Sequence, residues 1–376
     1  MAAGGTSGGS RVVGGKPGYV LMVVPGRPGG IDRVIDYLVG AWPQSPTLPP
    51  VRLARSRGRS RLGSPFHLGA VLLLLLVDGM RGRIALAHIN MASRGSTVRK
   101  FILVAAARLV GVPYVLHLHG GGFREFHASL PRPARRPVDW IFHHAARVLV
   151  LGNVWRRWVE VEVGVAAEWI QVLPNGVPDP LAGAPVPVRQ PNRAPMLLFL
   201  GRMGPRKGVD DLLQALAASP MQGTAWRAVL AGDGDVARTR ALVAELGLSD
   251  RVDVAGWLDP AQTRAALAKA DLFVLPSYAE GLSVAVLEAM AWALPVVVTP
   301  VGAHGEVVRS GETGILVDPG DVAALGQAMY RLITQPEDRR CMGQAGRQRF
   351  LANYELASVL RQLGACYAQI PMRTRG

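Results

Sequence analysis

The chain has 376 residues, 49% of them hydrophobic, which is enough for two domains with sizeable cores. Its two cysteines, Cys341 and Cys366, are too few for a disulfide framework or a structural zinc site and fit a reducing compartment. The net charge of +15 is uneven, because the first 190 residues contain 23 Lys and Arg but only 9 Asp and Glu. So basic a half is typical of proteins that meet an anionic membrane, a nucleic acid or an acidic substrate, although it can also be only a solvated surface.

The first half of the chain follows a strand–helix pattern behind a short tail. Residues 1–17 are rich in Gly and Ser and have no compact apolar core, so we expect a flexible N-terminal tail on a cytoplasmic protein rather than a signal peptide. Short apolar runs then alternate with helical patterns. They predict strands at 19–25, 84–89, 114–119, 147–152 and 170–174, and helices at 30–41, 65–79, 95–109, 133–145 and 153–164.

Two neighbouring features of this half bear on membranes. The run 68–77 is apolar but shorter than the roughly 20 residues of a spanning helix. We expect a buried crossover helix there, and the alternative is an edge that enters a membrane interface. Four nearby arginines alternate along the chain and, if it is extended, project to one side. These arginines suit binding to an anionic membrane, such as the inner face of the plasma membrane, or to a phosphate-bearing lipid acceptor. The alternative is a disordered basic loop. No aromatic RNA-binding motif accompanies them, so we expect no nucleic acid. The arginines are Arg55, Arg57, Arg59 and Arg61.

The second half of the chain alternates more clearly between apolar strands and helices. Such a pattern predicts a parallel sheet that is covered on both faces. The predicted fold class is α/β, with two Rossmann-like doubly wound domains that face each other across a cleft. Ligands of such sheets bind beyond the carboxyl ends of the strands. The strands are predicted at 196–200, 227–231, 252–256, 272–276, 295–299 and 314–317. The predicted divisions are an N-terminal domain at 18–177, a Pro- and Ala-rich linker at 178–195, a C-terminal domain at 196–352, and a last segment, 353–376, whose helix is able to pack back on the N-terminal domain.

The most informative segment is EGLSVAVLE, at 280–288. Glu280 follows a predicted strand, and Glu288 lies about two turns into the next predicted helix. The start of a helix offers N–H groups to a phosphate, and a carboxylate beside it accepts hydrogen bonds from sugar hydroxyls. Together they indicate a nucleotide-activated sugar. Glu280 could instead be an ordinary charge at a helix start, but Glu288 has apolar neighbours in sequence, so a solvated face explains it poorly.

Three further residues lie at predicted strand ends. Arg202 and Lys207 flank a Gly-rich turn, where two cations can bind a diphosphate; the alternative is a surface turn. His119 precedes three glycines, which allow a ligand to approach the backbone. With His117 it has the form of a metal-binding pair, but no third ligand at a suitable spacing is apparent. Asp233 and Asp235 are expected to cap the next helix rather than to bind a metal.

These segments closely resemble the retaining glycosyltransferases of family 4, which have the GT-B fold and include bacterial mannosyl- and glucosyltransferases. The resemblance rests on residues 280–321 and on GRMGPRKGVDDLLQA at 201–215, and it covers essentially the whole second half. The first half matches more weakly, through HLHGGGF at 117–123 and VLPNGV at 172–177. The resemblance implies transfer of a hexose from a nucleoside-diphosphate sugar to a lipid-linked or growing polysaccharide acceptor, with retention of configuration and without a metal or other cofactor.

The resemblance also implies a role for each candidate residue. Arg202 and Lys207 stabilise the charge that develops on the leaving diphosphate, while His119 lies at the reacting face of the donor sugar. Glu280 holds sugar hydroxyls and Glu288 the ribose diol. The remaining implied contacts are the backbone amides of Gly281, Leu282 and Ser283 for the distal phosphate, the pair Gly29 and Gly30 where diphosphate and acceptor meet, and the Asn175–Gly176 turn at the domain boundary.

Three other functions are compatible with parts of the pattern. A sugar-nucleotide epimerase or related hydrolase would share the fold. A glycosidase would use Glu280 and Glu288 as acid and nucleophile, which leaves the two cations without a purpose. A basic scaffold that binds RNA or membranes without catalysis would have no need for four intact charged site residues.

Overall fold

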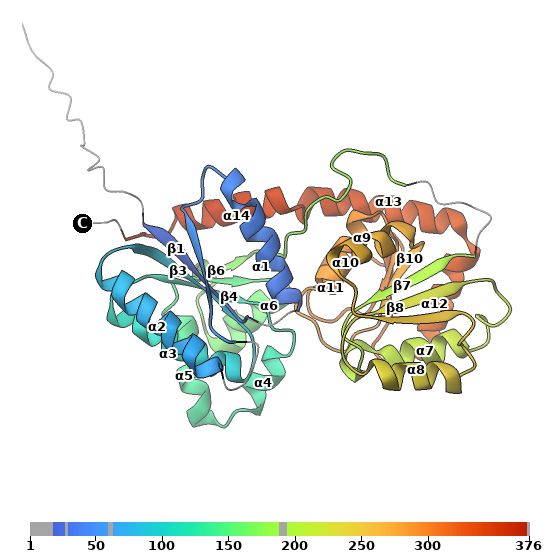
Figure 1. Ribbon diagram of the computed structural model, residues 1–376, viewed down its shortest axis with the longest axis horizontal. Helices are drawn as coiled ribbons and strands as arrows, with labels where there is room; N and C mark the ends of the chain where they lie inside the picture. The colour runs from blue at the N-terminus through green and yellow to red at the C-terminus, as the bar shows by residue number, and fades with distance from the viewer. Residues whose placement is uncertain (1–17, 27–28, 59–62, 188–193, 374–376) are drawn as a thin grey trace, which may run out of the picture.

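The computed structural model describes residues 18–26, 29–58, 63–187 and 194–373. Figure 1 shows two α/β domains side by side, each built on one parallel six-stranded sheet. The predicted fold class is confirmed. The first sheet contains β1 (Tyr19–Val24), β2 (Val51–Arg55), β3 (Ile84–Met91), β4 (Tyr114–Leu118), β5 (Arg147–Val150) and β6 (Ile170–Val172). The second contains β7 (Met196–Leu200), β8 (Arg227–Ala231), β9 (Val252–Gly256), β10 (Leu272–Leu275), β11 (Val296–Val298) and β12 (Gly314–Leu316).

The order of the strands decides where ligands can bind. In the first sheet the order is β2-β1-β3-β4-β5-β6, and in the second it is β12-β11-β10-β7-β8-β9. The direction of winding therefore changes between β1 and β3 in the first sheet and between β7 and β10 in the second. Doubly wound sheets bind ligands at this switch point, beyond the carboxyl ends of the strands. In the second sheet, the loops concerned carry Lys207 and Glu280.

Helices cover both faces of each sheet, as buried, almost wholly apolar strands require. The N-terminal domain has α1 (Gly30–Ala41), α2 (Ser64–Met80), α3 (Gly95–Leu109), α4 (Phe123–Ser129), α5 (Arg132–His143) and α6 (Asn153–Trp158), which continues as a π-helical turn at Val159–Val163. The C-terminal domain has α7 (Val209–Ala217), α8 (Val236–Glu245), α9 (Pro260–Lys269), α10 (Val284–Ala291), α11 (His304–Val307), α12 (Val322–Thr334) and α13 (Pro336–Asn353).

The last helix, α14 (Leu356–Ala368), returns to the N-terminal domain, where it lies beside α1 (Figure 1). Its apolar stripe is buried, and at its end the Tyr367 hydroxyl lies 2.6 Å from Nδ1 of His88 on β3. The two passages of the chain between the domains run side by side, because Val177 donates to the carbonyl of Tyr354 (3.1 Å) and accepts from Leu356 (2.9 Å). The hinge is therefore a paired crossing rather than a single linker.

The run 68–77 lies in α2, which connects β2 with β3, so the predicted crossover helix is present but is only partly buried. Within the run Val71 and Leu75 are buried and Leu73 is 64% exposed, and elsewhere on α2 Phe66 and Met80 are 81% and 67% exposed. A helix that is apolar all round needs cover on every side. Here the sheet and α3 cover only part of the surface of α2 (Figure 1). No helix in the described ranges has both the length and the apolar character needed to cross a membrane.

The basic loop predicted around residues 52–61 is partly a strand. Val51 to Arg55 form β2, an edge strand that pairs in parallel with β1. The sequence gives little sign of it because an edge strand is only partly buried, and here Ala54 is its one buried residue. Arg55 is exposed at its end and Arg57 is half-buried in the bend that follows, whereas Arg59 and Arg61 lie outside the described residues. The prediction also missed α4.

Candidate active site

Lys207 and Glu280 meet at the switch point of the second sheet. Lys207 ends a short 3₁₀ turn after β7, and Gly208 follows with a left-handed φ of 66°. A Cβ atom at this glycine would overlap the carbonyl of Pro276, so only glycine lets the turn pack against the end of β10. This packing brings Nζ of Lys207 into an ion pair with Oε1 of Glu280. The loops after β7 and β10 thus share one buried charge pair.

The surroundings of Glu280 keep its carboxylate ionised. The residue is only 7% exposed, and this burial by itself raises the pKa. The charge of Lys207, the nearby His304 and hydrogen bonds from Lys207 and Ser277 outweigh the burial, so the pKa of Glu280 is lowered overall. Ser277 Oγ donates to Oε1 at 2.8 Å. A buried, ionised carboxylate with a fixed direction is suited to accept hydrogen bonds from neighbouring hydroxyls.

Arg202 lies on the same edge of the sheet but does not contact this pair. Its side chain is 71% exposed, and Nη1 lies 3.4 Å from Oδ2 of Asp233, which follows the neighbouring strand β8. Of the two aspartates expected to cap the next helix, Asp235 occupies the N-cap position of α8, but its side chain makes no capping hydrogen bond. Asp233 does not cap the helix and accepts from Arg202 instead.

The loop that starts α10 is held by a histidine that the sequence analysis missed. His304 Nδ1 lies 3.1 Å from the carbonyl oxygen of Thr299, so this nitrogen donates, and Nε2 accepts the N–H of Ser283 at 3.3 Å. Of the three predicted phosphate-binding amides, one is therefore already engaged. Within the described ranges, those of Gly281 and Leu282 have no acceptor. His304 stands in the segment that resembles the family, but no spacing pattern distinguishes it.

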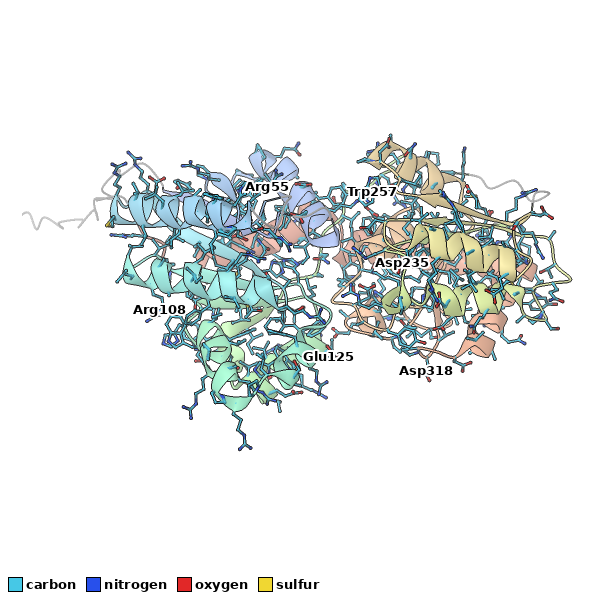
Figure 2. The ribbon with its side chains drawn as sticks, turned by 60° about the horizontal axis from the view of Figure 1, so that its bottom comes forward. Arg55, Arg108, Glu125, Asp235, Trp257 and Asp318 are labelled. Carbon is cyan, nitrogen blue, oxygen red and sulfur yellow. The ribbon has the colours of Figure 1, made fainter. Side chains whose placement is uncertain are left out.

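The two domains touch at this loop. A Cβ atom on Gly281 would overlap the carbonyl oxygen of His119, so the residue that follows β4 lies directly against the loop that precedes α10. Trp155 Nε1 donates to the carbonyl of Gly281 (3.1 Å), and Asn175 Nδ2 donates to that of Leu282 (2.8 Å). A pocket of about 170 Å³ opens beside Glu280, lined from both domains. Glu125 of α4, another of its lining residues, marks the edge of the N-terminal domain in Figure 2.

His119 is buried and neutral. Burial lowers its pKa to about 3. Its Nε2 lies 2.8 Å from Oδ1 of Asn90, whose Nδ2 donates to the carbonyl of Val23, so Nε2 of His119 carries the proton. The ring of His117 packs 3.9 Å from that of His119, and the pKa of His117 is also well below its ordinary value because of burial. Among the described residues, no cluster of three or more His, Cys, Asp or Glu has the arrangement of a metal site.

Glu288 is buried at the domain boundary and contacts the N-terminal domain. Its Oε1 accepts from the Tyr37 hydroxyl (2.6 Å) and pairs with Nε of Arg33 (2.9 Å), both on α1. Its Oε2 is buried without a hydrogen-bond partner in the described structure. Burial raises the pKa of Glu288 despite the opposing charge of Arg33. The sequence analysis missed Arg33 and Tyr37, although their spacing of four puts them on one face of a helix.

Gly29 and Gly30 lie at the start of α1, the helix that follows β1 along the chain. Gly29 directly precedes α1 and its carbonyl accepts the N–H of Arg33 (3.0 Å), while Gly30 is the first helical residue. Both are exposed at the switch point of the first sheet. The same helix therefore connects this loop with Glu288.

Two doubly wound sheets with their switch-point loops in contact define the chain as an α/β protein of the GT-B type, the class of many glycosyltransferases. Residues 20–176 match the family described as glycosyl transferase 4-like domain, and residues 186–349 match glycosyl transferases group 1. The chain belongs to the family 4-like glycosyltransferases, and it is an enzyme that transfers sugars. The interpretations as a glycosidase, an epimerase or a scaffold without catalysis are therefore set aside.

Known relatives and structures agree with this assignment. Alpha-D-kanosaminyltransferase of Streptomyces kanamyceticus is 27% identical over 348 residues, covering 89% of this chain and 84% of that protein. Phosphatidyl-myo-inositol mannosyltransferase of Mycobacterium leprae is 30% identical over 277 residues, or 68% and 73% of the two chains. The structure of Anabaena HepE with UDP has a TM-score of 0.74 at 18% identity, covering 94% of this chain and 100% of that one.

Proposed function

We propose that the enzyme transfers a hexose from a nucleoside-diphosphate sugar, with retention of configuration and without a metal, to an acceptor held by the N-terminal domain. One observation carries the proposal: the loop and helix at 280–288 hold two buried carboxylates, one paired with Lys207 and one with an unpartnered oxygen. Such a junction suits the three parts of a nucleotide sugar, with the sugar at Glu280, the diphosphate at Lys207 and the ribose at Glu288. The related fold of HepE has been solved with UDP and with UDP-glucose, which supports a donor of this class.

In the proposed reaction each group has a task that its position supports. The Lys207 ammonium has three N–H donors, so it can bind a phosphate oxygen while it remains paired with Glu280. The amides of Gly281 and Leu282 belong to the loop that carries Glu280 and have no acceptor among the described residues, and Arg202 is an exposed cation on the same edge of the sheet. These positive groups stabilise the charge on the diphosphate as the glycosidic bond breaks. The carbonyl of His119 lies close to the loop, where it can stabilise positive charge at the anomeric carbon.

An apolar stripe on the N-terminal domain supports a lipid-linked acceptor on an anionic membrane. It runs along α2 and α3, which pack side by side, at spacings of seven on α2 and of four and seven on α3, so each set follows one helix face. Arg55 at the end of β2 and Arg108 in the last turn of α3 are labelled on the N-terminal domain in Figure 2, and the half of the chain that contains the stripe holds nearly all the excess positive charge. Exposed apolar and basic residues together are the signature of interfacial binding, and the same charge would repel a cationic acceptor. The apolar stripe consists of Phe66, Leu73, Met80, Val98, Ile102 and Leu109.

We expect one of UDP, GDP and ADP, and the matching nucleotide sugar, to raise the melting temperature of the protein. A ligand at about 100 times its Kd adds about 2.7 kcal/mol to the free energy of unfolding, an effect that a thermal-shift screen detects easily. The corresponding nucleoside and free hexoses serve as controls. If no nucleoside diphosphate or nucleotide sugar shifts the transition at millimolar concentration, the proposed donor class is wrong.

Replacing Leu73 and Leu109 together with Ser should reduce sedimentation of the protein with vesicles that contain an anionic phospholipid. Each leucine that enters the interface contributes up to about 1.5–3 kcal/mol, so we expect at least a tenfold loss of partitioning. The matched control replaces Val161 and Leu351, which are exposed but lie outside the apolar stripe. Equal sedimentation of the Leu73 and Leu109 variant and the wild type would show that the apolar stripe does not bind membranes.

A further inference from the structure

Helix α1 of the N-terminal domain reaches Glu288 of the C-terminal domain with two side chains. Arg33 and Tyr37 lie one helical turn apart and both approach the same oxygen, Oε1, at 2.9 and 2.6 Å. Arg33 Nε also donates to the Tyr37 hydroxyl at 2.9 Å, so the three side chains form a closed triangle. Such a triangle fixes the direction of the carboxylate more firmly than one hydrogen bond would.

The other oxygen of this carboxylate, Oε2, accepts no hydrogen bond from the described residues. Glu288 is 4% exposed, and its Oε2 has no hydrogen-bond partner among the described residues. A buried acceptor that is left unsatisfied costs about 1–3 kcal/mol, so it needs a physical reason, and binding a ligand is one such reason. The protein therefore binds one oxygen of the carboxylate, Oε1, and leaves the other, Oε2, available to accept a hydrogen bond from a ligand.

We propose that Arg33 and Tyr37 are positioning residues of the nucleotide site, which hold Glu288 so that Oε2 receives the ribose hydroxyls of the donor. This inference rests on the proposed role of Glu288 as the ribose ligand. It makes the N-terminal domain part of the ribose site, although neither residue touches the nucleotide. Because α1 starts at Gly30, the same helix that follows the glycine loop also carries the two side chains that hold Glu288.

The protonation states of the three groups agree with this arrangement. The pKa of Tyr37 is raised to about 12, first by burial and then by the charge of Glu288, so its hydroxyl remains a hydrogen-bond donor. Burial raises the pKa of Glu288, and the guanidinium of Arg33 opposes that shift. An ionised carboxylate accepts more hydrogen bonds than a protonated one, so Arg33 favours the form that binds a diol.

The test compares a nucleotide that has the diol with one that lacks it. Calorimetry would measure the Kd of the nucleoside diphosphate that the wild-type protein binds best among UDP, GDP and ADP, and that of its 2′,3′-dideoxy counterpart. In Arg33→Met and Tyr37→Phe we expect about a tenfold weaker affinity for the ribonucleotide, as for loss of a hydrogen bond to a charged group, and no change for the dideoxynucleotide. The KM for the donor should rise while kcat changes less than about twofold, and Arg33→Lys should restore part of the affinity. Asp36→Asn, an exposed change on the same helix, is the control.

Three results would overturn the inference. An equal loss for both nucleotides would mean that α1 only supports the fold. Tighter binding of the ribonucleotide by the variants would mean that α1 competes with the ribose instead of preparing its site. If the wild type itself binds both nucleotides equally, Glu288 does not bind the ribose, and the proposed role of that residue fails together with the inference. In the first two cases the proposed donor site remains intact.

Discussion

Replacing Glu280 with Gln should lower kcat at least about a hundredfold and leave the Kd of the nucleoside diphosphate within a few fold. Glutamine keeps the shape of the side chain and its bond to Ser277, but it carries no charge to pair with Lys207 or to accept strongly from sugar hydroxyls. Loss of one preorganised polar group at a reacting centre commonly costs 10²–10³ in kcat, about 2.7–4 kcal/mol. Initial rates at saturating donor would give kcat, and calorimetry would give the affinity.

The matched control for this variant is Glu312→Gln, an exposed carboxylate of the same domain that pairs with Arg309 at the surface. Its kcat should equal that of the wild type. If Glu280→Gln has the same kcat as the wild type, this carboxylate has no catalytic role. A large loss of nucleotide affinity would instead mean that Glu280 acts on the diphosphate, through Lys207, rather than on the sugar.

Replacing Lys207 with Met should also lower kcat about 10²–10³-fold, because the proposed function uses this cation, which pairs with Glu280, to stabilise the leaving diphosphate. The same change leaves Glu280 buried without its partner, which costs about 3–5 kcal/mol of stability. The double variant with Glu280→Gln separates the two effects, since it removes the unpaired charge but not the catalytic defect. Arg206→Met, an exposed cation of the same turn, is the control and should have wild-type kcat.

The stability of the Lys207 variant should depend on pH with an opposite sign to that of the wild type. In the wild type the pKa of Glu280 is lowered, so its contribution is complete above the ordinary value of 4.5 and is lost as the pH falls through the folded-state pKa. Without Lys207, burial dominates and the pKa of Glu280 rises, so the variant gains stability as the pH falls. Urea unfolding at pH 5 and 7.5 would show the deficit shrink at the lower pH, and a constant deficit would contradict the ion-pair account.

The sequence predicted the second sheet best because its strands are buried on both faces. All six of its strands were placed within one residue at each end, and with them the loops that carry Lys207 and Glu280. Strand β2 escaped prediction because it lies at an edge and buries only Ala54. The exposure of α2 was not predicted either, because hydrophobic residues in sequence do not show whether a second layer will cover them.

Contacts between the domains were the least predictable part of the site. Arg33 and Tyr37 are more than 250 positions from Glu288 in the chain, so no local periodicity links them to it. His304 contacts the loop before α10 by accepting one backbone N–H, an interaction that no sequence pattern predicts. The sequence predicted the site residues that follow strands of the second sheet, but not the residues of the N-terminal domain that contact them. It indicated correctly that His119 lies at the carboxyl end of a strand and that Gly29 and Gly30 lie between a strand and the next helix, since alternating strands and helices place such loops at one edge of the sheet.

The direction of α2 and α3 determines how a lipid-linked acceptor would reach the cleft. Both helices run against the strands they connect, so Phe66 and Val98 lie near the edge that faces the C-terminal domain, while Met80 and Leu109 lie at the far end. A protein resting on a bilayer along this line would hold the mouth of its cleft at the height of the lipid head groups. Such an acceptor could then present its hydroxyl to the donor while its hydrocarbon tail stays in the membrane.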